Sequence, residues 1–158
     1  MRIILLLLSV VLVTGCSGGP EDPDTSLPSA NEYDAALATR LGADEYGMRR
    51  YVMALLKAGP NRNLDAEAAE RLQRAHLDNI GRLADAGKLS VAGPFLDDGK
   101  LRGIYIFNVE TIEEARQLTA TDPAVKAGSL VMELHPWYGS AALMQVYEVH
   151  KKLAQKKI

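Results

Sequence analysis

The feature that most constrains the fold is an alternation of strand-like and helix-like segments that begins near Met48. Apolar runs bounded by Gly and Pro flank two longer segments with helical periodicity. The segments follow one another as strand, helix, strand, strand, helix, strand, at residues 51–56, 64–87, 89–92, 103–109, 111–121 and 130–137. This order is typical of the ferredoxin-like βαββαβ arrangement, in which two helices cover one face of a four-stranded antiparallel sheet. We therefore expect an α+β fold.

The two expected helices carry clear terminal signals. Asp65 is suited to cap the first helix, and Gly87 is suited to end it in a left-handed conformation. Apolar residues recur at helical spacing on both sides of His76, so this imidazole should face the sheet. Thr111 and Glu114 have the spacing of a capping box at the start of the second helix.

The first and third strands are apolar on both faces, so the sheet face without helices also needs a cover. We favour a homodimer in which the sheets of two copies pack face to face. The alternative is that the C-terminal segment covers this face within one chain. Ser140 would cap a helix in that segment, and lysines in its last turn would suit the helix dipole.

The N-terminus indicates export and lipid anchoring. Arg2 precedes eleven largely apolar residues, which are too few to cross a hydrocarbon core of about 30 Å but fit a signal peptide. Residues 12–16, LVTGC, resemble a lipobox, in which Cys16 becomes lipid-modified and N-terminal after cleavage. An uncleaved anchor with an incidental cysteine is the alternative. Ser17, in place of Asp, favours the outer membrane in a Gram-negative cell, so we expect a lipid-anchored, periplasm-facing envelope protein.

The composition and the expected segment boundaries indicate one globular domain behind a tether. The chain has 158 residues, 47% of them hydrophobic, and a formal net charge of -2, which fits one globular domain and argues against a nucleic-acid partner. Residues 17–31 are rich in Gly, Pro and acidic residues, as in a flexible tether. We expect a signal peptide at 1–15, a lipidated Cys and tether at 16–46, a folded domain at 47–138 and a C-terminal helical tail at 139–158.

Six short strings within the folded domain occur in the order and spacing of a known family. They are AHL at 75–77, AGKL at 86–89, AGPFLDDG at 92–99, EA at 114–115, TDPAVKAG at 121–128 and PW at 136–137. Over residues 48–138 the chain resembles the YCII-related (YciI-like) domain family. The resemblance implies a dimeric α+β-barrel fold and a site built on a His and an Asp. It also implies acid/base elimination chemistry, since one related enzyme is a dehydrochlorinase of a chlorinated hydroxyquinol. The lipobox, tether and tail depart from typical members.

His76 is the leading candidate for a catalytic acid/base, because it matches the site histidine that the resemblance implies. An imidazole can accept and return a proton near neutral pH. The alternative is a core histidine that only satisfies its own hydrogen bonds. Three carboxylates are candidates to orient it, and we favour Asp122, then Asp97, over Asp98. Each also has an ordinary structural interpretation, as a cap before Pro123 or as part of a turn.

Other side chains are weaker candidates. Glu133, His135 and Trp137 alternate onto one face of the last strand, where they line either a pocket or a partly solvated edge; we favour the edge. His150 is expected to be exposed on the tail helix. The sequence has no nucleophile elbow, nucleotide loop or metal-ligand spacing, so we expect no cofactor and no metal.

The functional expectation is a membrane-anchored YCII-like protein. It would be a lyase or isomerase type of enzyme that acts without a cofactor on a small organic molecule, with His76 paired to Asp122 or Asp97. The alternative is a non-catalytic dimeric binding or envelope-assembly module, whose tether and tail would dock to another envelope component.

Overall fold

The computed structural model describes residues 32–156, and the folded unit begins at Asp34. The expected signal peptide and Cys16 lie outside the described residues. The folded unit consists of α1 (Ala35–Leu41), β1 (Met48–Ala58), α2 (Ala66–Asp85), β2 (Leu89–Pro94), β3 (Leu101–Phe107), α3 (Ile112–Thr119), α4 (Pro123–Lys126), β4 (Leu130–Ser140), the 3-10 helix η1 (Ala141–Gln145) and α5 (Val146–Leu153). No helix within residues 32–156 is both long and apolar enough to cross a bilayer.

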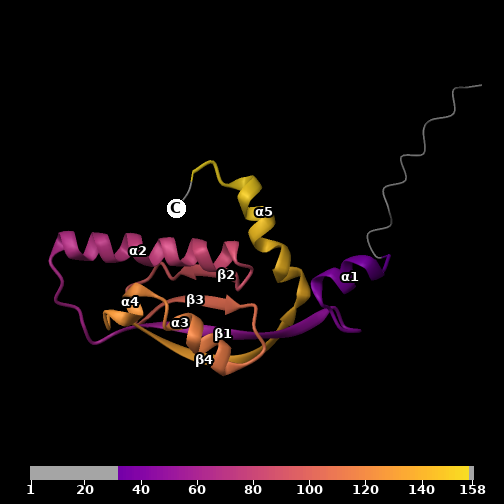
Figure 1. The fold of residues 1–158 in the computed structure, drawn as a ribbon, viewed down its shortest axis with the longest axis horizontal. Coiled ribbons are helices and arrows are strands. Elements are labelled where there is room, and N and C mark those ends of the chain that lie inside the picture. The colour runs from indigo at the N-terminus through magenta and orange to yellow at the C-terminus, as the bar shows by residue number, and fades with distance from the viewer. Residues whose placement is uncertain (1–31, 157–158) are drawn as a thin grey trace, which may run out of the picture. The chain divides into compact units, whose positions relative to one another are not determined.

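The four strands form one antiparallel sheet in the order β2-β3-β1-β4. Figure 1 shows the sheet with α2 alongside β2 and the shorter helices α3 and α4 nearer β4. This is the topology of the ferredoxin-like fold, as found in dimeric α+β barrels. The predicted fold class, including a helical C-terminal extension, is therefore confirmed.

The helix signals act as the sequence predicted. The Asp65 side chain accepts a hydrogen bond from the Ala68 N–H, and Gly87 has φ +67°, a value that favours glycine after a helix. Thr111 caps α3, although Glu114 accepts from the Thr111 hydroxyl and not from its backbone N–H.

Apart from shifts of two or three residues at the ends of other elements, three features differ from the expected segments. The last strand runs to Ser140 and not to Trp137, because its pairing with β1 continues to the start of that strand. Helix α1 lies within the segment expected to be a tether, where Asp34 caps it and Gly42 ends it. The helix expected over residues 111–121 ends at Thr119, and one more helical turn, α4, begins at Pro123.

The hydrophobic core lies between the helices and one face of the sheet. The buried residues that form it come from the sheet, from α2 and α3 and from the segment after β3: Val52, Ala54, Leu56, Leu83, Leu89, Tyr105, Phe107, Val109 and Ala115. Because side chains alternate along a strand, Met53 and Leu55 of β1 point to the opposite face. We call this opposite face the open face.

The C-terminal segment covers part of the fold and not the whole open face. Element η1 contacts β1 and β2, and α5 contacts β2. The Ser90 hydroxyl lies 3.4 Å from the Met144 sulfur, which fixes η1 beside β2. Leu55 and Ile104 in the middle of the open face remain half-buried, and Val131 is exposed. Figure 1 shows α5 rising beside the C-terminal end of α2.

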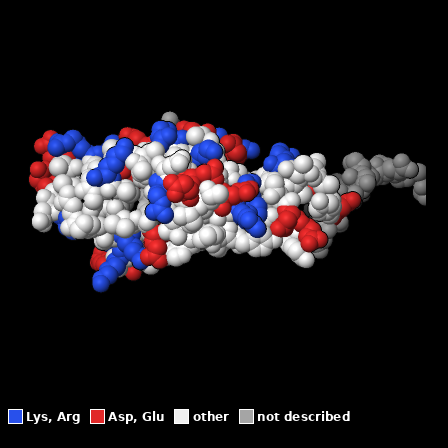
Figure 2. Space-filling view, turned by 60° about the horizontal axis from the view of Figure 1, so that its bottom comes forward, with Lys and Arg blue, Asp and Glu red and all other residues white. Residues whose placement is uncertain are grey.

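The surface carries no large field of one charge on the face drawn in Figure 2. Lys and Arg side chains alternate there with Asp and Glu, and broad uncharged areas separate them. This pattern agrees with the formal net charge of -2.

Candidate functional site: a buried His–Asp pair beside a groove

His76 and Asp122 contact each other between α2 and the turn that begins α4. The His76 Nδ1 lies 2.9 and 3.0 Å from the two carboxylate oxygens of Asp122. The His76 side chain is 10% exposed and the Asp122 side chain is 1% exposed, so the pair is shielded from solvent. Because a carboxylate accepts hydrogen bonds, Nδ1 carries the hydrogen and Nε2 is left as the other functional atom of the ring.

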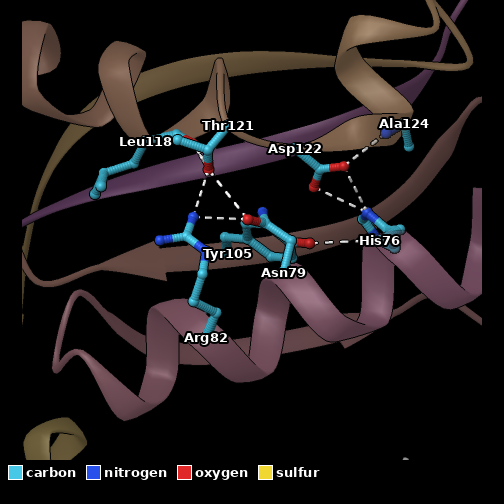
Figure 3. Close-up of polar contacts among 8 residues, drawn as sticks. All are labelled: His76, Asn79, Arg82, Tyr105, Leu118, Thr121, Asp122 and Ala124. Atoms are coloured by element: carbon cyan, nitrogen blue, oxygen red, sulfur yellow. Dashed lines mark hydrogen bonds and ion pairs between the residues drawn. The ribbon is translucent and has the colours of Figure 1, made fainter.

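The local sequence explains why Asp122 is held in place. Asp122 is the N-cap of α4, and its Oδ1 accepts a hydrogen bond of 2.8 Å from the Ala124 N–H. Pro123 occupies the first helical position, where a missing N–H is tolerated and the fixed φ suits a helix. One carboxylate therefore both starts a helical turn and orients an imidazole (Figure 3).

Tyr105 on β3 faces the other nitrogen of the imidazole. Its hydroxyl lies 3.3 Å from His76 Nε2, and the two rings are nearly parallel with centroids 6.2 Å apart. Burial, and then the negative charge of Asp122, raise the pKa of the Tyr105 hydroxyl well above its usual value. The phenol therefore stays neutral at ordinary pH and can donate a hydrogen bond to Nε2.

A second set of polar contacts lies one turn further along α2. The Arg82 guanidinium donates to Asn79 Oδ1 at 2.7 Å and to Thr121 Oγ1 at 2.8 Å. The Thr121 hydroxyl lies 2.7 Å from the Leu118 carbonyl. Figure 3 shows that His76, Asn79 and Arg82 project from one side of α2 toward the segment that joins α3 to α4. These contacts hold that segment, and hence Asp122, against α2.

A groove of about 1540 Å³ runs beside the pair, with walls from α2, β2, β3 and α5. His76 and Tyr105 are both in its lining. Several apolar side chains line it as well: Leu56, Leu72, Leu77, Ile80, Val91 and Ala92. A mainly apolar groove with a few convergent polar groups is the usual form of a small-molecule site.

Residues 50–138 match the YCII-related domain family. The chain belongs to this family. The matched segment runs from Arg50 in β1 to Tyr138 in β4, and thus contains the His76–Asp122 pair and Tyr105. Helix α1, η1 and α5 lie outside the match.

One solved structure similar to the chain is 5-chloro-2-hydroxyhydroquinone dehydrochlorinase (TftG) from Burkholderia phenoliruptrix AC1100, in complex with 2,5-dihydroxybenzoquinone. The identity is 21%, the TM-score is 0.41, and the similarity covers 54% of this chain and 92% of the other. No curated protein matches the chain.

The YCII domain brings together only one of the two favoured carboxylates with His76. Asp122 contacts the ring, whereas Asp97 lies in the exposed turn between β2 and β3, with its side chain near Gly99. Asp98 is exposed in the same turn. The sequence left the choice between these aspartates open, and the geometry favours Asp122 alone.

The other histidines lie elsewhere. His135 is 2.9 Å from Glu133 on the open face, with both side chains nearly half exposed, and Glu133 also pairs with Lys57. The Trp137 ring packs against Tyr51, at 5.8 Å between centroids. His150 is exposed on α5. No group of three or more His, Cys, Asp or Glu within the described part of the chain has the geometry to hold a metal ion.

Tyr105 is the site residue that sequence reasoning missed. It lies within the apolar run of the third strand, where aromatic residues are ordinary core components. Its hydroxyl could have indicated the site from the sequence, because a polar atom in an apolar strand needs a hydrogen-bond partner.

Proposed function

We propose that this YCII protein is a cofactor-independent acid/base enzyme of the lyase or isomerase type that acts on a small organic molecule in the groove. The observation that carries the proposal is the buried His76–Asp122 contact at the wall of an open, mainly apolar groove. Asp122 orients the ring through Nδ1, and His76 lines the groove, so Nε2, which Tyr105 contacts, is the nitrogen left to abstract a proton.

The proposed step begins when His76 Nε2 takes a proton from a carbon next to an electron-withdrawing group. The C–H bond breaks, and its electron pair forms either an enolate or a double bond with loss of an anionic leaving group. Asp122 stabilises the imidazolium that forms, without taking the proton itself. The neutral Tyr105 hydroxyl, 3.3 Å from Nε2, supplies a hydrogen bond to the developing negative charge once it turns from the ring. The proton then returns to the product or passes to solvent.

Deuterium exchange tests this proposal without knowledge of the natural substrate. The full chain is incubated in D₂O with a panel of carbon acids that includes β-halo carbonyl compounds, α-hydroxy ketones and hydroxylated quinols, and exchange is followed by NMR. His76→Gln is expected to slow exchange by about 10²-fold or more, as is typical for loss of a general base. His135→Gln, on the open face, is the matched control and should keep the wild-type rate.

Two results would contradict the proposal: a folded His76→Gln variant that keeps its exchange rate, or a wild type that exchanges no member of the panel. The second result would favour a non-catalytic binding or envelope-assembly module.

We also propose a homodimer formed through the open face. Leu55, Ile104 and Val131 support it, because they leave an apolar strip that η1 does not cover. Light scattering on the full chain should give the mass of two copies, and a monomer mass would contradict this. Anchoring through Cys16, on the periplasmic side of the envelope, stays a prediction from the sequence.

A further inference from the structure

The groove extends along the whole of α2 and not only around His76. Its lining begins at Arg62 and Leu64, just before the helix, and continues to Asp85 at the helix end. Twenty helical residues span about 30 Å, and His76 is close to the middle. The shape therefore suits a long molecule better than a compact one.

The charged groups of the groove favour an anion. Among the described residues, its lining includes six Lys or Arg side chains and two Asp side chains, in a chain with a net charge of -2. Asp78 pairs with Arg74, Asp85 accepts a hydrogen bond from Tyr147, and Lys151 pairs with Glu148 outside the lining, so two of the six cations are already compensated.

Two of the arginines lie at the end of the groove near the start of α2. Arg62 donates to the Ser129 carbonyl at 3.2 Å, and Arg102 donates to the Gly99 carbonyl at 3.4 Å. Both acceptors are neutral, so each guanidinium keeps its charge and further N–H groups for a ligand.

Helix α5 forms the wall at the opposite end. The Tyr147 hydroxyl lies 2.5 Å from Asp85 Oδ1, which fastens α5 to the last turn of α2, and Val146 and His150 line the groove beside it. Gly81, one turn before Asp85, also lines the groove, and a Cβ added there would meet no atom within 4 Å. This part of the groove is therefore open space and not a packed interface.

We infer that the groove binds an elongated molecule with an apolar body and an anionic group, with the anionic group near Arg62 and Arg102 and α5 closing the other end. The inference rests on the proposed function in one respect, since it assigns the substrate class of that same site. It also gives α5, which lies outside the family match, the role of a specificity-determining wall.

Calorimetric titration of the full chain with three probes tests the inference. Decanoate and 2-naphthoate carry the anionic group on an aliphatic and an aromatic body, and 1-decanol is the neutral counterpart of decanoate. We expect decanoate to bind at least tenfold more tightly than 1-decanol. Arg102→Gln should raise the dissociation constant of decanoate about tenfold, because a charge-assisted contact is lost. It should change the dissociation constant of 1-decanol less than twofold. Whichever of the two acids binds more tightly shows whether the apolar part of the ligand is aliphatic or aromatic.

Gly81→Leu tests the α5 end. The leucine side chain should fill the open space and weaken the binding of all three probes about tenfold. The stability of α2 should stay the same or increase, because Gly is a poor helix former. Ala66→Leu, which adds a similar side chain at an exposed α2 position outside the groove, and Arg71→Gln, at a cation outside it, should change binding less than twofold.

Equal binding of decanol and decanoate, dissociation constants above 1 mM for both acids, or wild-type binding by Gly81→Leu would each overturn the inference. Its failure is distinguishable from failure of the proposed function, since binding is measured without turnover. Tight decanoate binding without deuterium exchange in any carbon acid would refute the enzyme and leave the ligand class standing.

Discussion

A histidine lies beside a carboxylate on each side of the sheet, and the nitrogen–oxygen distance is the same in the two pairs. His76 Nδ1 lies 2.9 Å from Asp122, and His135 Nε2 lies 2.9 Å from Glu133. The side chains of the first pair are 10% and 1% exposed, and those of the second are 48% and 44% exposed. Distance alone therefore does not distinguish a candidate site from a surface contact. Burial does, because in a single copy of the chain water screens the second pair and competes for its hydrogen bonds.

The largest expected difference between the two faces is in stability. Asp122→Ala removes the partner of a buried imidazole and the cap of α4, and should lower the free energy of unfolding by about 3 kcal/mol. Urea-induced unfolding of the full chain measures this change. A loss below about 1 kcal/mol would mean that the buried pair contributes no more than a surface pair, and the comparison would fail.

A smaller effect is expected from the buried phenol at alkaline pH. The raised pKa of Tyr105 means that the folded state keeps its proton above pH 10, while the unfolded state loses it. The contribution of Tyr105 to the free energy of unfolding should therefore be fully present below pH 10. Above pH 10 it should fall by about 1.4 kcal/mol per pH unit.

Tyr105→Phe isolates this contribution, since other tyrosines and lysines also titrate in that range. Unfolding midpoints of the wild type and the variant, compared between pH 9 and 11, should converge as pH rises. Parallel curves would show that the Tyr105 hydroxyl is accessible to solvent and ionises normally.

The smallest expected effect belongs to the open face. Glu133→Ala is the matched counterpart of Asp122→Ala and, at protein concentrations at which the chain is monomeric, should leave the free energy of unfolding nearly unchanged, as for exposed ion pairs. Hydrogen bonds from Lys57, and then its charge, lower the pKa of Glu133, so raised salt should bring the variant and the wild type closer together. A loss as large as that of Asp122→Ala at those concentrations would contradict the comparison, whereas a loss that appears only at higher protein concentration would support the proposed homodimer, in which this face is buried.

The sequence predicted the fold well, because each element carries its own local signal. Asp65 and Gly87 delimit α2, and the order of apolar segments determines the sheet topology. The sequence does not predict α1, since a seven-residue helix with no buried side chain leaves little periodicity to detect.

The candidate site could be predicted only in part. His76 was identifiable because a polar ring interrupts an inward-facing helical stripe. Which aspartate reaches it depends on contacts 46 residues apart, and local patterns carry no such information. Tyr105 was missed because its aromatic ring fits a core strand, and its hydroxyl becomes significant only when β3 lies opposite α2.

The Asp122 carboxylate both stabilises a turn of the backbone and orients the side chain of His76. The oxygen that receives the Ala124 N–H also contacts the imidazole, so unwinding of the α4 turn would release the ring. Glutamate at this position would extend the carboxylate by one methylene and could not serve both partners from the same place. A ligand or partner that pulled on the α3–α4 connection would thereby alter the reactivity of a histidine on a different helix.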